Sequence, residues 1–179
     1  MSATIGILGG MGPDATADLF VKIIRRTPAR RDQDHLHVII DNNPKIPDRA
    51  AALFGRGPDP RPALIETARN LVRAGADLIV MPCNTAHAYY DALAEAVPVP
   101  ILHMMKEVAV WRRLEHPRVR RVGLLATSAT ILSGLYHREL QVDGVEVVVP
   151  DELHQQAVMR AIYGPESVKA GNYQRARQW

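Results

Sequence analysis

The chain has 179 residues, of which 47% are hydrophobic, and a formal net charge of +3. This composition supports a sizeable core and excludes an intrinsically disordered chain. One cysteine excludes an internal disulfide, and no metal-ligand pattern surrounds it, so we expect no metal and a reducing, cytoplasmic setting. No apolar run approaches the roughly 18 residues of a membrane span, and no basic leader precedes the first strand, so we expect no membrane segment and no signal peptide.

The basic residues are spread over several segments, and aromatic residues make up only 5% of the chain. Nucleic-acid binding surfaces usually interleave basic and aromatic side chains. A solvated surface therefore explains the positive charge better, and we expect no nucleic-acid partner.

Apolar runs that suggest strands alternate with stretches that suggest helices. Strands are predicted over residues 3–8, 36–40, 78–80, 101–102, 121–125 and 145–149. Helices are predicted over residues 13–26, 62–74, 104–114, 129–140 and 152–163, and a further helix from Ala86. Pro13 suits a helix start, Gly75 a helix end and Asp151 an N-terminal cap. The alternation predicts an α/β fold of parallel β-α-β units with helices flanking the sheet.

Ligands of such folds bind beyond the carboxyl ends of the strands. Four loops follow predicted strands and carry glycine or short polar residues: 9–12, 41–44, 83–85 and 126–128. We expect these loops to converge on one site.

The only cysteine, Cys83, lies between a predicted strand and a predicted helix. A helix N-terminus favours the thiolate, which is the reactive form of cysteine. The alternative is a small buried hydrophobic residue, but the polar neighbours Asn84 and Thr85 argue against it. His87 follows one helical turn later, where it faces either the same cleft or the core.

The other loops each have two interpretations. The segment 9–13 is either an anion-binding turn or a tight turn that needs glycine, and the tight turn is favoured because the Walker lysine and the GxGxxG spacing are missing. In the segment 41–49, Arg49 either presents a planar fork to a carboxylate or lies on a solvated loop. The hydroxyls of 126–130 are explained most simply as helix caps.

Together these segments resemble the aspartate/glutamate racemase family of cofactor-independent amino-acid racemases. The matching stretches are residues 5–13, 43–49, 81–87, 125–130 and 162–171. Their order and spacing agree over nearly the whole chain.

The resemblance implies two similar lobes, 1–99 and 100–179, with parallel sheets flanked by helices and the substrate in the cleft between them. It implies interconversion of L- and D-aspartate or glutamate without pyridoxal phosphate or metal. Maleate isomerisation and arylmalonate decarboxylation, which related enzymes carry out, are less favoured because Lys169 matches the racemases. The family commonly forms dimers, so we expect a homodimer.

The family moves the α-proton with two residues on opposite faces of the substrate, usually both cysteines, and Cys83 matches one of them. The implied substrate contacts are Asn84, Thr85 and Thr127 for the α-carboxylate and ammonium groups, Arg49 and Lys169 for the side-chain carboxylate, and Met11 and Asn43 for the walls of the site.

The second family cysteine, in a Gly-Cys-Thr-Glu type segment, has no counterpart in this chain. We therefore expect a truncated family member whose second lobe is incomplete. One hypothesis is a racemase in which a partner chain, or a residue such as His154 or Asp151, supplies the second proton donor. The other is a catalytically impaired binding protein, a pseudoenzyme that retains a dicarboxylate-binding cleft.

Overall fold

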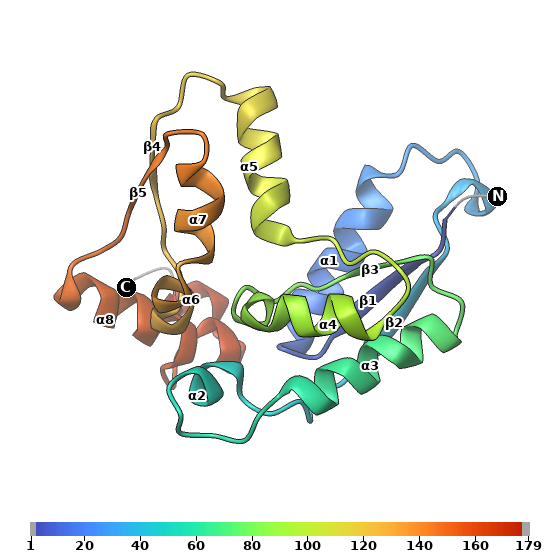
Figure 1. The fold of residues 1–179 in the computed structure, drawn as a ribbon, viewed down its shortest axis with the longest axis horizontal. Helices are drawn as coiled ribbons and strands as arrows, with labels where there is room; N and C mark the ends of the chain where they lie inside the picture. The colour runs from blue at the N-terminus through green and yellow to red at the C-terminus, as the bar shows by residue number, and fades with distance from the viewer. Residues whose placement is uncertain (1–2, 177–179) are drawn as a thin grey trace. The chain divides into compact units, whose positions relative to one another are not determined.

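The computed structural model of the chain describes residues 3–176 (Figure 1). The chain divides into two compact units, Met1–Met104 and Met105–Trp179. Each unit has its own parallel sheet, with strand order β2-β1-β3 in the first and β4-β5 in the second. Parallel sheets flanked by helices confirm the predicted α/β class. The lobe limits 1–99 and 100–179, and the incompleteness of the second lobe, stay predictions.

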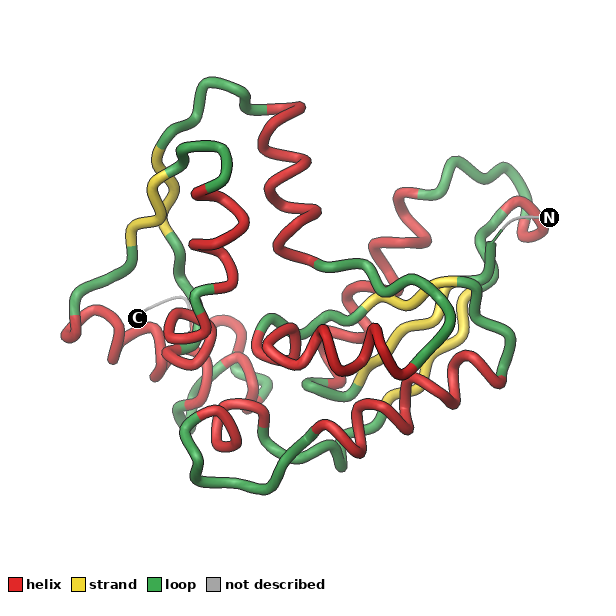
Figure 2. Tube along the Cα trace, in the orientation of Figure 1, coloured by secondary structure: helices red, strands yellow, loops and turns green. Residues whose placement is uncertain are grey.

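The sheet of the first unit is built around β1 (Ile5–Gly9). It pairs in parallel with β2 (Val38–Asn42) on one side and with β3 (Leu78–Val80) on the other (Figure 2). The predicted strand at 101–102 is reduced to one parallel bridge between Ile101 and Ile79. The first unit therefore presents the carboxyl ends of three adjacent strands at one edge of its sheet.

The α-helices of the first unit are α1 (Pro13–Arg26), α2 (Arg49–Leu53), α3 (Arg61–Arg73) and α4 (Tyr90–Ala96), and the 3₁₀ helices are Asp32–Asp34 and Thr85–Tyr89. α1 has the predicted limits and begins at its proline. α2 was not predicted, although Asp48 caps it by accepting a hydrogen bond from the backbone N–H of Ala51 at 2.7 Å.

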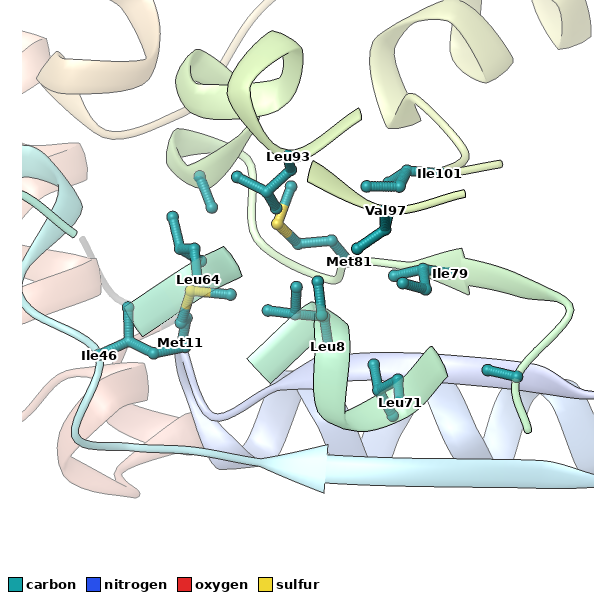
Figure 3. Close-up of a cluster of buried hydrophobic side chains, with 13 residues drawn as sticks. Leu8, Met11, Ile46, Leu64, Leu71, Ile79, Met81, Leu93, Val97 and Ile101 are labelled. Carbon is teal, nitrogen blue, oxygen red and sulfur yellow. The ribbon is translucent and has the colours of Figure 1, made fainter. Parts of the chain in front are cut away.

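The core of the first unit lies between the sheet and the helices α3 and α4 (Figure 3). Leu64 and Leu71 lie about two helical turns apart on the inner side of α3, and both are buried in one cluster with Leu8 of β1. Leu93 of α4 and Ile79 of β3 complete the centre of the cluster. Burial of each of these side chains contributes about 1.5–3 kcal/mol, so this packing fixes the sheet on which the loops stand.

The second unit contains β4 (Arg121–Gly123) and β5 (Glu146–Val148), which pair in parallel. Its helices are α5 (Met104–Glu115), whose first residue belongs to the first unit, α6 (Ser128–Ser133), α7 (Leu135–Gln141), α8 (Glu152–Tyr163), the 3₁₀ helix Val168–Ala170 and α9 (Tyr173–Ala176). Residues 177–179 lie outside the described part of the chain. Within residues 3–176, every helix is too short or too polar to span a bilayer.

The single helix predicted over 129–140 is wrong, because Gly134 divides it into α6 and α7. Gly134 has a φ of 65° and ends α6 in the left-handed conformation. Glycine adopts this conformation without the steric cost that other residues incur, so the chain changes direction here.

An ion pair ties α5 to the turn after α7. Nη2 of Arg112 lies 2.5 Å from Oδ2 of Asp143, and the side chain of Arg112 is only 7% exposed. Nη1 of Arg113 lies 3.0 Å from the same oxygen. Burial would raise the pKa of Asp143, but the hydrogen bonds from both guanidinium groups outweigh it and lower the pKa below its usual value. The buried arginine therefore depends on this carboxylate for its neutralisation.

A close approach between two loops depends on Gly10. This residue follows β1 with a φ of 92°, and a Cβ atom added to it would lie 2.3 Å from the carbonyl carbon of Asn43. No side chain fits at that distance, so a residue without Cβ lets the loop after β1 lie against the loop after β2.

We expect Gly10→Ala to lower the free energy of unfolding by about 3 kcal/mol or more, because it combines backbone strain with a steric clash. Gly75→Ala is the matched control, since Gly75 has a φ of 97° and open space around it. The control should be destabilised by backbone strain alone, about 1–2 kcal/mol. Urea unfolding measures both losses, and equal losses would contradict the close packing of Gly10.

We expect Asp143→Asn to destabilise the protein at pH 7, because it leaves the buried Arg112 without its charged partner. The lowered pKa of Asp143 means that its contribution is complete above the unfolded value of about 3.9 and is lost as the pH falls through the folded pKa. The difference from wild type in urea unfolding should therefore shrink below about pH 4.

Glu146→Gln is the control for this ion pair, since Glu146 pairs with Arg121 on the surface with its side chain 63% exposed. Exposed pairs contribute little, so its unfolding curve should match wild type at every pH. If Asp143→Asn has the same free energy of unfolding as wild type at pH 7, Arg112 does not depend on the charge of Asp143.

Candidate functional site

Three of the four predicted loops lie at the carboxyl edge of the first sheet. The loop 9–12 follows β1, the loop 41–44 follows β2, and the loop 83–85 follows β3. Parallel pairing places these strand ends at the same edge, as the sequence predicted. The fourth loop, 126–128, follows β4 in the other sheet, and its convergence with the first three stays a prediction.

The backbone of Cys83 is held on both sides. Its N–H donates to the carbonyl of Met81 at 2.8 Å, and its carbonyl accepts a hydrogen bond from Nδ1 of His87 at 2.8 Å. The side chain is half-buried and packs at the margin of the core. Both interpretations of this residue therefore apply in part, since it packs against the core and keeps part of its surface exposed.

The helix predicted from Ala86 is present, but its first part is a 3₁₀ helix. A 3₁₀ helix, Thr85–Tyr89, follows Cys83, and the α-helix α4 begins only at Tyr90. One short 3₁₀ segment aligns few peptide dipoles, so the helix-dipole contribution expected at the thiol is weaker than a long α-helix would give.

His87 faces the core, with only 1% of its surface exposed. The backbone N–H of Met104 donates to its Nε2 at 3.1 Å, so the ring proton is assigned to Nδ1, which donates to the Cys83 carbonyl. Burial lowers the pKa of His87, and the nearby Cys83 carbonyl only partly opposes this effect. The ring is therefore neutral near pH 7, and both of its nitrogens are occupied.

The neighbours of Cys83 differ in exposure. Thr85 is buried, whereas Asn84 is half-buried. Met11 is also buried, and its side chain lies in the core cluster beside Ile46 (Figure 3). Its backbone, between Gly10 and Gly12, is the part of this residue that belongs to the loop after β1.

Asn43 supports the loop in which it lies. Its amide nitrogen donates to the hydroxyl of Thr67 at 3.0 Å, and its side-chain oxygen accepts from the N–H of Lys45 at 3.1 Å. Thr67 is almost fully buried on α3. These bonds tie the loop after β2 to the helix beneath it.

Sequence reasoning missed the part played by two buried threonines, Thr16 and Thr67. The hydroxyl of Thr16 accepts a hydrogen bond from the N–H of Gly10 at 3.0 Å and lies 3.3 Å from the Gly12 carbonyl. Because the Gly10 amide is used internally, this contact favours the tight turn over an anion-binding loop. The available signal was a threonine on the inner side of each amphipathic helix, a position that is usually apolar.

Arg49 is the first residue of α2 and folds back on its own loop. Nη1 donates to the carbonyls of Ile46 and Pro47 at 3.1 and 3.0 Å. Nε is buried and has no hydrogen-bond partner among the described residues. The hydroxyl of Tyr89 donates to the Arg49 carbonyl at 3.3 Å, and this contact joins α2 to the segment after Cys83.

In the second unit, Thr127 caps α6, as the sequence predicted for this loop. Its hydroxyl accepts a hydrogen bond from the N–H of Thr130 at 3.2 Å. Gln155 of α8 donates from Nε2 to the Ala126 carbonyl at 3.0 Å and to the Ser128 hydroxyl at 3.2 Å. A cavity of about 460 Å³ adjoins this loop; its lining residues are Ser128, Glu152, Gln155, Gln156, Met159 and Arg160.

The remaining candidates of the second unit lie on the surface. Lys169 is exposed, and its Nζ lies 5.1 Å from the centre of the Tyr163 ring, which is a cation–π distance. Asp151 caps α8 and lies 2.7 Å from Nδ1 of His154. Hydrogen bonds from the backbone and ring of His154 lower the pKa of Asp151. These two residues form an exposed cap pair at a helix start.

Comparison with known proteins places this geometry in one family. The family model described as Asp/Glu/Hydantoin racemase matches residues 8–179. The chain is 36% identical over 162 residues to the broad specificity amino-acid racemase RacX of Bacillus subtilis, a match that covers 88% of this chain and 69% of that protein. A glutamate racemase of Aquifex pyrophilus is 37% identical over 84 residues, or 46% of this chain and 33% of that protein.

Solved structures of an aspartate racemase and of a homologue of that enzyme have similar folds. The aspartate racemase of Picrophilus torridus has a TM-score of 0.86 and 34% identity, and the match covers 99% of this chain and 72% of that one. A homologue of aspartate racemase from Pyrococcus horikoshii has a TM-score of 0.71 and 28% identity, covering 97% of this chain and 74% of that one. From the family match over nearly its full length and these shared folds, the chain belongs to the Asp/Glu/hydantoin racemase family.

Proposed function

We propose that this chain binds a small acidic amino acid, aspartate or glutamate, and that the thiol of Cys83 moves its α-proton without pyridoxal phosphate or metal. The observation that carries this proposal is the place of Cys83 in a racemase-family chain. It is the only cysteine, and it lies in the loop between β3 and the following 3₁₀ helix. Its backbone N–H and carbonyl are both hydrogen-bonded.

Removal of an α-proton needs a close base and donors that stabilise the carboxylate as negative charge develops. In the proposed step the Cys83 thiolate takes the α-proton, the C–H electron pair moves into the carboxylate system, and a proton returned to the opposite face gives the other enantiomer. Asn84, Thr85 and Thr127 are the proposed hydrogen-bonding partners of the α-carboxylate and ammonium groups.

Arg49 and Lys169 are the proposed contacts of the side-chain carboxylate. For Arg49, the support is the buried Nε, which has no hydrogen-bond partner in the described part of the chain, while Nη1 donates to two carbonyls. An unpaired buried donor is costly, and a carboxylate on the Nε edge of the guanidinium group would remove that cost. Met11 and Asn43 remain proposed wall residues, and a cytoplasmic homodimer remains part of the proposal.

A binding protein without full racemase activity is the second candidate, and the single cysteine favours it. One thiol reaches one face of the α-carbon, whereas inversion needs a proton donor on the other face. Such a protein would bind the dicarboxylate and would either exchange the α-proton with retention or not exchange it at all.

We expect the wild-type protein, incubated in heavy water with L-aspartate or L-glutamate, to replace the α-proton with deuterium. Cys83→Ala should reduce this rate about 10²–10⁴-fold, the range for loss of an acid–base group. Proton NMR follows the exchange and chiral chromatography follows the D-enantiomer. A neutral amino acid in the panel measures the breadth of the substrate range, and maleate measures the competing isomerisation.

His35→Gln is the matched control for this experiment, because it removes an exposed histidine that precedes β2 and has no proposed role in the site. Exchange that yields D-product supports the racemase, and exchange that yields only deuterated L-substrate means that Cys83 acts on one face. Binding by calorimetry without exchange selects the binding protein. Undiminished exchange in Cys83→Ala would contradict the assignment of the thiol.

We expect Arg49→Lys to weaken aspartate binding about tenfold or more, because lysine keeps the charge but loses the fork that holds a carboxylate. Calorimetric titration measures the dissociation constant. Arg56→Lys is the control, since Arg56 is exposed, follows α2 closely and has its guanidinium group over the Phe54 ring. Equal dissociation constants for wild type and Arg49→Lys would remove Arg49 from the site.

A further inference from the structure

The position of Cys83 depends on a ring that the proposed chemistry does not use. The backbone N–H of Met104 donates to Nε2 of His87, and Nδ1 of the same ring donates to the Cys83 carbonyl. With both nitrogens bonded, His87 has no lone pair with which to take a substrate proton. Any effect of His87 on the proposed proton transfer must therefore come from the groups that it holds in place.

The far end of this connection is anchored to the sheet. The N–H of Ile79 in β3 donates to the Pro100 carbonyl, and the N–H of Leu102 donates to the Ile79 carbonyl, both at 2.9 Å. The Tyr90 hydroxyl donates to the carbonyl of Ile101 at 3.0 Å. The segment 100–104 thus gives the imidazole a fixed point that is held by β3 itself.

The ring is also fixed sideways. His103, which is buried, meets the ring of His87 edge-on with centroids 5.2 Å apart, and it meets Tyr90 at 4.7 Å. Close packing of this kind limits rotation of the imidazole. On the near side, the N–H of Cys83 donates to the Met81 carbonyl, so the hydrogen bond from His87 holds the second backbone group of this residue.

We propose that His87 is a positioning residue for Cys83: its buried imidazole connects the Cys83 carbonyl to the sheet-anchored segment 100–104 and so fixes the direction of the thiol. The inference rests on the proposed role of Cys83 in proton transfer. A thiol that must approach an α-proton along one line loses rate when its direction varies, even if substrate binding is unchanged.

Two substitutions separate the halves of this connection. In His87→Asn, the amide nitrogen occupies the place of Nδ1 and keeps the bond to Cys83, but the bond from Met104 is lost. In His87→Gln, the longer amide places its oxygen near the position of Nε2 and keeps the bond from Met104, but the bond to Cys83 is lost. Each variant loses one buried hydrogen bond, so their losses of stability should be similar.

The first readout is alkylation of Cys83 by iodoacetamide at fixed pH, followed by mass spectrometry, which does not require any racemase activity. We expect His87→Gln to react about five- to tenfold faster than wild type, because the released turn opens more often. His87→Asn should stay within about twofold of wild type, since it retains the bond to the Cys83 carbonyl.

The second readout is α-proton exchange with aspartate. We expect kcat to fall about tenfold in His87→Gln with little change in KM, and His87→Asn to retain most of the wild-type kcat. If wild type shows no exchange, the proposed function fails, while the alkylation rates still decide the positioning role. Equal alkylation rates in folded His87→Asn and His87→Gln would overturn the inference and leave His87 a purely structural residue.

Discussion

The parallel pairing of β1 with β2 and β3 is the constraint on which the candidate site depends. Because all three strands run in the same direction, their carboxyl ends meet at one edge, and the loops that follow are neighbours whatever their own sequences favour. Gly10 brings two of these loops into contact, since its missing Cβ lets the first loop rest on the backbone of Asn43. The strand pairing therefore sets where the site lies, and Gly10 allows the loops after β1 and β2 to touch.

Buried polar side chains then hold each loop in one conformation. Thr16 accepts a bond from the first loop, Thr67 accepts one from the second, and His87 donates one to the third. Each of these side chains lies almost entirely inside the protein, where an unpaired polar group is costly, so alternative loop conformations are disfavoured. Groups that are oriented during folding need no reorganisation when charge develops on a substrate, which is the physical basis of electrostatic catalysis. Arg49 is the exception, because its buried Nε has no hydrogen-bond partner within residues 3–176.

The sequence predicts most of the first unit because its periodicity is strong and its helix ends are marked. α1 begins at Pro13 and has the predicted limits, and β3 is the short apolar run before Cys83. The failures have local physical causes. The prolines around Asp48 concealed α2, and Gly134 divided a helix whose apolar pattern continues across it. The bonds of the site were less predictable, since His87 pairs with a backbone group 17 residues away and only the folded sheet brings that group close.

The neutral state of His87 narrows the search for the second proton donor. In the proposed reaction, Cys83 serves one face of the α-carbon and another group must serve the other. A buried histidine four residues from the thiol is an obvious candidate. Both of its nitrogens are occupied and burial disfavours its charged form, so it does not carry a proton to the substrate. Donating through Nε2 would require the Met104 N–H to turn away from the ring, and that N–H belongs to a segment anchored to β3. The hydrogen bonds proposed to orient Cys83 are thus the same ones that exclude His87 as the second proton donor of the proposed reaction.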